Sequence, residues 1–182
     1  MKGIFDKKKI WIIILTMMIS LLIGTMIVFA ADNYGAIGAK QTEDYTLEEM
    51  LTYAIQDEYL ARAEYELIMS EYGEQRPFSN IIKAEEYHIE LLKPLFEKYN
   101  VSIPKDNSSE YIVLPEDIQA ALQTGVKAEV DNIEMYEKFL LEDIPSDVAE
   151  VFEELKRGSE NHLKAFERGL ERNGGRGQGY RG

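Results

Sequence analysis

Three glutamates and two histidines interrupt segments of the chain that otherwise present apolar faces. Glu85 and His88 are three residues apart, a spacing that places both side chains on one face of a helix. Glu58, Glu129 and His162 stand at similar places in three other segments. Carboxylate and imidazole groups bind hard or borderline metal ions, and an inward carboxylate without a cation carries a large desolvation cost. The five residues therefore predict a metal site inside a helical domain.

The apolar residues around these groups recur at spacings of three and four, which predicts four amphipathic helices. The four stripes are Leu47, Leu51, Ala54, Ala61, Tyr65, Ile68 and Tyr72; Phe78, Ile81, Leu92, Leu95 and Tyr99; Ile118, Leu122, Tyr136 and Phe139; and Val148, Phe152, Leu155, Phe166 and Leu170.

Local signals predict where these helices begin and end. Thr46 and Glu49 have the spacing of a capping box, and Gly73 is typical of a helix end. Pro115 is expected in the first turn of the third helix, and Ser146 caps the fourth. Short joins make each pair of helices an antiparallel hairpin, whereas a long connection separates helices two and three. The expected fold is all-α, an antiparallel four-helix bundle.

The N-terminal residues 1–31 form a separate segment. Four lysines precede an uncharged stretch over residues 10–31 that ends at Asp32. Its 22 residues fit a cleavable signal peptide or a retained membrane anchor, since a membrane span takes about 20 residues. The basic flank stays inside, so the remainder is expected to be extracytoplasmic, either secreted or anchored to the membrane.

The rest of the chain divides into three parts. Residues 32–44 lack apolar periodicity and are expected to form a linker, and residues 45–171 form the helical domain. Residues 172–182 are rich in Gly and Arg, which is typical of a disordered tail.

Charge and cysteine content exclude several classes of function. Residues 1–30 contain four of the 20 basic residues and one of the 33 acidic residues, so the remainder carries a formal charge of −16. Such acidity argues against nucleic acid as a partner and favours cations. The chain has no cysteine, which excludes disulfides, thiolate metal sites and iron–sulfur clusters.

Each candidate ligand taken alone has a commoner explanation. A helix-face glutamate usually pairs with a basic residue, and Arg62 is one turn from Glu58. A single inward histidine is usually a satisfied core residue. The metal site is favoured because the chain's only two histidines both lie on inward faces, opposite inward glutamates. Five neighbouring residues are expected to supply hydrogen bonds to the ligands or simply to pack around them: Arg62, Tyr65, Asn132, Tyr136 and Ser159.

The residues resemble the rubrerythrin branch of the ferritin-like superfamily. The run Asp-Glu-Tyr-Leu-Ala-Arg-Ala-Glu-Tyr at 57–65 resembles the first-helix motif of that branch, and Glu-Glu-Tyr-His at 85–88 resembles its second-helix Glu-x-x-His. The run Arg-Gly-Ser-Glu-Asn-His-Leu-Lys-Ala-Phe at 157–166 is similar to the last helix of an uncharacterised ferritin-like domain family of unknown function. The resemblance covers about residues 45–171 and implies a ferritin-like bundle.

The resemblance implies a di-iron centre in which Glu85 bridges the two ions, and its ligands would be Glu58, Glu85, His88, Glu129 and His162. One departure is that Ser159 stands where the fourth helix usually supplies a glutamate. Three carboxylates leave one positive charge against two divalent ions, which a hydroxide, another anion or an acid such as Asp131 or Glu134 must offset. The site is therefore expected to hold one or two ions, with manganese or zinc as alternatives to iron.

These observations predict an extracytoplasmic metal-dependent oxidoreductase that reacts with oxygen or peroxide. Reductive peroxidase activity would need a separate electron donor, because the chain lacks a cysteine-rich electron-transfer module. Two alternatives remain open: a protein that captures or buffers metal without turnover, and a metal-free structural bundle at the cell surface. The expected partners are metal ions, oxygen or peroxide, and the membrane if the N-terminal segment is retained. A homo-oligomer also remains open.

Overall fold

The computed structural model describes residues 33–177, and all regular structure in this range is helical. The elements are α2 (Gly35–Ala39), α3 (Leu47–Tyr72), α4 (Phe78–Lys98), the 3₁₀ turn η1 (Ser108–Glu110), α5 (Ile118–Phe139) and α6 (Ser146–Gly177). The all-α prediction is confirmed for this part of the chain. The predicted N-terminal signal or anchor lies outside the described residues. Within residues 33–177, no helix has the length and apolar character needed to cross a membrane.

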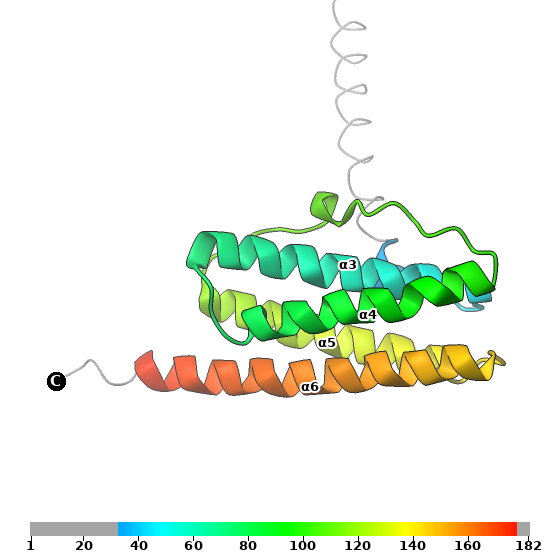
Figure 1. Ribbon diagram of the computed structural model, residues 1–182. Coiled ribbons are helices and arrows are strands. Elements are labelled where there is room, and N and C mark those ends of the chain that lie inside the picture. The colour runs from blue at the N-terminus through cyan, green and yellow to red at the C-terminus, as the bar shows by residue number, and fades with distance from the viewer. Residues whose placement is uncertain (1–32, 178–182) are drawn as a thin grey trace, which may run out of the picture. The chain divides into compact units, whose positions relative to one another are not determined.

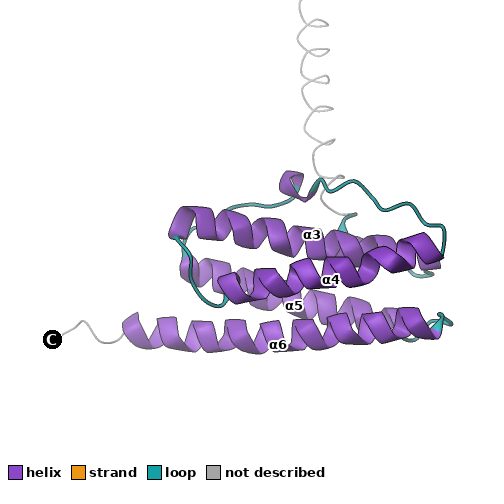
Figure 2. Cartoon of the chain, in the orientation of Figure 1, coloured by secondary structure: helices purple, strands orange, loops and turns teal. Residues whose placement is uncertain are grey.

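The four long helices lie side by side in two tightly packed pairs (Figure 1). The most extensive contacts join α5 to α6 and α3 to α4, and further contacts join α4 to α6 and α3 to α5. A short loop connects the helices within each pair, whereas the connection from α4 to α5 is long and contains η1 (Figure 2). The predicted long connection between the second and third long helices is therefore present.

The capping box at the start of α3 has the predicted form. The Thr46 hydroxyl accepts a hydrogen bond from the Glu49 backbone N–H at 3.2 Å, and Glu49 Oε2 accepts one from the Thr46 backbone N–H at 2.9 Å. At the other end, Gly73 follows the last residue of α3 with φ 83°, a conformation that favours glycine. These two signals set the length of the helix that carries Glu58.

The start of α5 differs from the prediction. We expected Pro115 in the first turn, but α5 begins at Ile118. Asp117 is the capping residue, and its Oδ1 accepts a hydrogen bond from the Ala120 backbone N–H at 2.7 Å. A carboxylate cap satisfies a free backbone donor, which proline cannot do.

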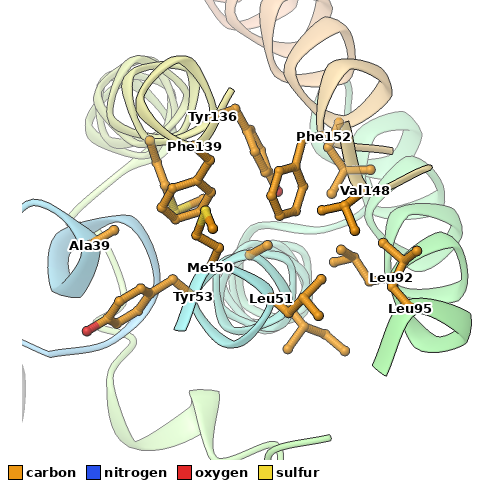
Figure 3. Packing of buried hydrophobic residues seen from close by; sticks show 14 of the residues in the cluster. Ala39, Met50, Leu51, Tyr53, Leu92, Leu95, Tyr136, Phe139, Val148 and Phe152 are labelled. Atoms are coloured by element: carbon orange, nitrogen blue, oxygen red, sulfur yellow. The ribbon is translucent and has the colours of Figure 1, made fainter. Parts of the chain in front are cut away.

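The segment predicted as a linker is partly folded against the helices. Tyr34, Ala36 and Ala39 are buried, and the Ala36 backbone N–H donates a hydrogen bond to Asp57 Oδ1 at 2.8 Å. Figure 3 shows Ala39 facing the cluster around Met50. Residues 35–39 of the segment predicted as a linker form the short helix α2, in which small residues are buried without an amphipathic stripe. The predicted tail is also helical up to Gly177, and residues 178–182 lie outside the described range.

The apolar interior consists of two clusters, and every long helix passes through both. The first cluster includes Leu51, Leu92, Tyr136, Phe139 and Phe152, and the second includes Ile68, Phe78, Leu122 and Phe166. Figure 3 shows the first cluster, in which the Tyr136 and Phe152 rings lie 5.6 Å apart between centroids. Along each helix, the polar residues singled out in the sequence fall between the two clusters. The packing therefore places one polar layer between two apolar layers.

Candidate metal centre

The polar layer contains all five predicted ligands. Each is buried, with the exposed fraction ranging from 1% for Glu58 to 7% for His162. The ligands form two groups that share Glu85: one with Glu58 and His88, the other with Glu129 and His162. Within each group, the potential ligand atoms lie within 4.8 Å of one another. Four helices thus bring three carboxylates and two imidazoles to one place.

Glu85 offers one carboxylate oxygen to each imidazole. His88 Nδ1 lies 3.0 Å from Glu85 Oε2 and 3.0 Å from Glu58 Oε2. His162 Nδ1 lies 3.1 Å from Glu85 Oε1 and 3.4 Å from Glu129 Oε1. The contacts of His162 lack hydrogen-bond geometry, so its Nδ1 is a buried atom without a hydrogen-bond partner among the described residues. Such an atom is costly to bury unless something else binds it.

Two buried tyrosines, one on α3 and one on α5, each donate a hydrogen bond to the glutamate of the other helix. Tyr65 follows Glu58 by seven residues on α3, but its hydroxyl donates to Glu129 Oε1 on α5 at 3.2 Å. Tyr136 follows Glu129 by seven residues on α5, and its hydroxyl donates to Glu58 Oε1 on α3 at 2.9 Å. Each bond fixes one oxygen of a glutamate and leaves the other for an additional partner.

A glycine of α6 makes room for one imidazole. The His88 and His162 rings are stacked, with centroids 5.8 Å apart. A Cβ added at Gly158 would lie 2.6 Å from His88 Nε2 and closer still to Cε1. This role of Gly158 was not predicted from the sequence. A glycine inside a predicted helix could have indicated it. Such a glycine destabilises the helix by about 1 kcal/mol relative to alanine, so its presence suggests a close contact that excludes a side chain.

In the absence of metal, the layer is a network of charged pairs. Burial would lower the pKa of His88, but Glu58 and Glu85 outweigh it and raise that pKa to about 10. Burial likewise opposes Glu129 and Glu85 at His162, and the pKa of this histidine also rises to about 10. Burial and the charge of Glu85 raise the pKa of Glu58 to about 7. Both imidazoles therefore carry protons at neutral pH, and a bound metal ion would have to replace them.

Asn132 and Ser159 lie in the same layer. They are 6% and 2% exposed, and Asn132 Nδ2 donates a hydrogen bond to Ser159 Oγ at 3.1 Å. Asn132 Oδ1 is a second buried atom without a hydrogen-bond partner among the described residues. The two predicted neighbours thus bond to each other and leave hydrogen-bonding capacity unused.

Comparison with known proteins assigns the chain to a family. Residues 48–181 match the uncharacterized protein domain DUF2202. The chain belongs to this family. An uncharacterized protein of Methanocaldococcus jannaschii, MJ0754, is 31% identical over 130 residues, which cover 63% of this chain and 70% of the relative. A crystal structure described as hypothetical protein MJ0754 from Methanococcus jannaschii superimposes with a TM-score of 0.63 at 28% identity, and the match covers 73% of this chain and 85% of that one.

Three residues expected near the centre of this DUF2202 domain have other partners. Arg62 does not pair with Glu58, because its Nη2 lies 2.5 Å from Asp106 Oδ2 in the long connection. Asp131 and Glu134, expected as sources of extra negative charge, both pair with Lys40, at 2.5 Å and 3.0 Å. The reason is the folded segment around α2, which brings Lys40 to α5.

Glu64 is a further carboxylate of the DUF2202 domain that was not predicted from the sequence. Its side chain borders a cavity of about 350 Å³ that is also lined by Leu60, Thr124 and residues 111–115. Burial and the charge of Glu129 raise the pKa of Glu64 to about 7. No helical periodicity singles out this carboxylate, because the long connection is what covers it.

Proposed function

We propose that this DUF2202 domain is a ferritin-like four-helix bundle that binds one or two divalent metal ions, iron in the first place, and reacts with oxygen or peroxide. The observation that carries the proposal is the position of Glu85, which presents one oxygen to His88 and the other to His162. Glu58 belongs to the group of His88, and Glu129 belongs to the group of His162. Shared carboxylates of this kind suit a pair of metal ions.

The ferritin-like part of the proposal is supported by residue pattern and helix arrangement together. Residues 57–65 and 85–88 resemble rubrerythrin motifs, and their glutamates and histidine lie in the polar layer. The two helix pairs, joined by a long connection, have the topology expected of ferritin-like folds.

The donor set fits a metal ion. Three buried carboxylates and two imidazoles offer only oxygen and nitrogen atoms, which suit iron, manganese or zinc. Nδ1 of His162 faces Glu85 and Glu129 without a hydrogen bond among the described residues, and binding to a cation would satisfy this atom. A cation would also offset the cost of burying the carboxylate charges.

The chain's own residues would position the metal and shield it from water. The tyrosines bond Oε1 of Glu58 and Oε1 of Glu129. Oε2 of each glutamate would then bind the metal ion, and in Glu58 this oxygen now lies 3.0 Å from His88 Nδ1. Stacking and the close approach of Gly158 fix the plane of the His88 ring. When bound, iron would supply the one-electron chemistry that oxygen or peroxide requires. Because the sequence of residues 1–31 predicts export, we place this activity outside the cytoplasm. Since the chain has no cysteine-rich electron-transfer module, a separate protein would have to donate electrons.

A metal-free network is the second candidate. It is favoured by the hydrogen-bond distances of His88 from both Glu58 and Glu85, which partly satisfy the layer without a metal ion. A bundle of this kind would have a structural role at the cell surface. A protein that captures or buffers metal would use the same ligands as the oxidoreductase. It would differ only in not reacting with oxygen or peroxide.

Metal analysis of the full chain, purified without chelators, tests the proposal. We expect one or two equivalents of iron, manganese or zinc in the wild type and loss of metal in Glu85→Ala. Glu86→Ala is the matched control, because Glu86 is the exposed neighbour on the same helix and should retain metal. Equal metal content in both variants and the wild type, or no metal in any, would contradict the proposal. Consumption of oxygen or peroxide on addition of ferrous iron then separates an oxidoreductase from a buffering protein.

A further inference from the structure

The two helix pairs carry the predicted ligands and the tyrosines bonded to them in the same pattern, with one exception. Glu58 and Tyr65 on α3 have the spacing of Glu129 and Tyr136 on α5, and each tyrosine bonds the glutamate of the other helix. This correspondence also relates α4 to α6, where His88 matches His162.

The exception is on α6. Glu85 stands three residues before His88, and Ser159 stands three residues before His162. The carboxylate that α4 supplies to the centre is therefore missing from α6. Ser159 is nevertheless 2% exposed, so its short side chain is directed into the interior.

The Asn132–Ser159 pair keeps hydrogen-bond donors available at this place. The amide has two N–H hydrogens and the hydroxyl one, and their mutual contact of 3.1 Å uses a single hydrogen. If the amide is rotated by half a turn, the hydroxyl donates to Oδ1 and both N–H groups are free, so two donors remain in either arrangement. Buried donors of this kind need acceptors.

The charge of the proposed metal centre indicates that the partner of these donors is an anion. Two divalent ions carry four positive charges, whereas Glu58, Glu85 and Glu129 supply three negative ones. Asp131 and Glu134 belong to neither ligand group and both contact Lys40, so they supply no further ligand oxygen to the centre. A monoanion from solution would neutralise the centre. The side chain of serine has three heavy atoms fewer than that of glutamate. Formate, which consists of three heavy atoms, therefore matches the part of a glutamate that Ser159 lacks.

We propose that Asn132 and Ser159 bind a small exogenous carboxylate or bicarbonate, which supplies the negative charge that the metal centre lacks. The proposal rests on the proposed function, because the unbalanced positive charge comes from two bound ions. The anion takes the place of the carboxylate that α6 lacks, and the free N–H and O–H groups donate to it.

Cobalt(II) provides the test, because its visible absorption responds to a change of ligand. The full chain is loaded with cobalt, the bound metal is counted, and formate or bicarbonate is titrated in separate experiments. We expect two cobalt ions and a saturable spectral change in the wild type. Ser159→Ala should weaken anion binding about tenfold, because it removes either a donor to the anion or the hydroxyl that orients the donors of Asn132. Ser159→Glu should bind two ions and show no response, because its own carboxylate fills the place.

The outcomes separate this inference from the proposed function. Absence of bound cobalt overturns the proposed function. A single bound cobalt, or two ions with no response to either anion, overturns the inference alone. Ser159→Ala keeps the test valid if Ser159→Glu does not fold, since equal anion affinity in the alanine variant and the wild type also refutes the inference. Ser102→Ala, in the exposed part of the long connection, is the control for loss of a hydroxyl elsewhere.

Discussion

Gly158→Ala is the substitution for which the structure gives the sharpest expectation. The added methyl group would lie 2.6 Å from His88 Nε2, well inside van der Waals contact. The His88 ring cannot easily withdraw, because its Nδ1 is held 3.0 Å from both Glu58 and Glu85. Either α6 moves away from α4 or the ring leaves its two carboxylates.

The expected cost follows from two opposing effects. Overpacking a close-packed interior costs about 1–3 kcal/mol, whereas replacing glycine by alanine inside a helix gains about 0.5–1 kcal/mol. We therefore expect a net loss of about 1–2 kcal/mol. For a domain of this size, each 1 kcal/mol changes Tm by about 2–4 °C, so Tm should fall by about 2–8 °C.

Thermal unfolding followed by circular dichroism checks this prediction, with Gly174→Ala as the matched control. Gly174 is also in α6, but a Cβ there would meet nothing within 4 Å. The control should keep or slightly raise the Tm, because it gains helix propensity without a clash. Equal changes in Tm for the two variants would refute the packing of α6 against the His88 ring. Metal content should also fall in Gly158→Ala alone.

Two further predictions concern the same layer. The pKa values of His88 and His162 are raised from 6.5 to about 10, so the stabilisation from their protonation is complete below pH 6.5 and is lost as the pH rises through 10. The Tm of chelator-treated protein should therefore fall between pH 7 and pH 10, and a Tm that stays constant over this range would contradict the ion-pair network. Tyr65→Phe and Tyr136→Phe should each lower the free energy of unfolding by about 1–3 kcal/mol, because each removes a hydrogen bond to a buried glutamate. Urea denaturation measures this loss, and unchanged midpoints in both variants would show that these bonds do not hold the glutamates.

The helices and the composition of the polar layer could be predicted from the sequence because both depend on periodicity. Glu58 and His88 follow the same spacing of three and four residues as the apolar side chains. They therefore lie on the buried face of their helices. The capping box at Thr46 is a local signal of the same kind. Such features involve residues that are near in sequence.

The features that could not be predicted depend on contacts between distant segments. The burial of Ala36 depends on the carboxylate of Asp57, 21 residues away. Arg62 has the correct spacing to pair with Glu58, but a partner in the long connection takes it instead. The fit of Gly158 against His88 depends on the distance between two helices, which periodicity does not determine.

The most direct test of the central claim is anomalous X-ray diffraction at the absorption edge of the bound metal, recorded from crystals of the full chain loaded with iron. The account predicts a peak about 2.0–2.2 Å from a Glu85 oxygen on the side of His88, with any second peak on the side of His162. A peak at any other place in the molecule, or none beside Glu85, would contradict it.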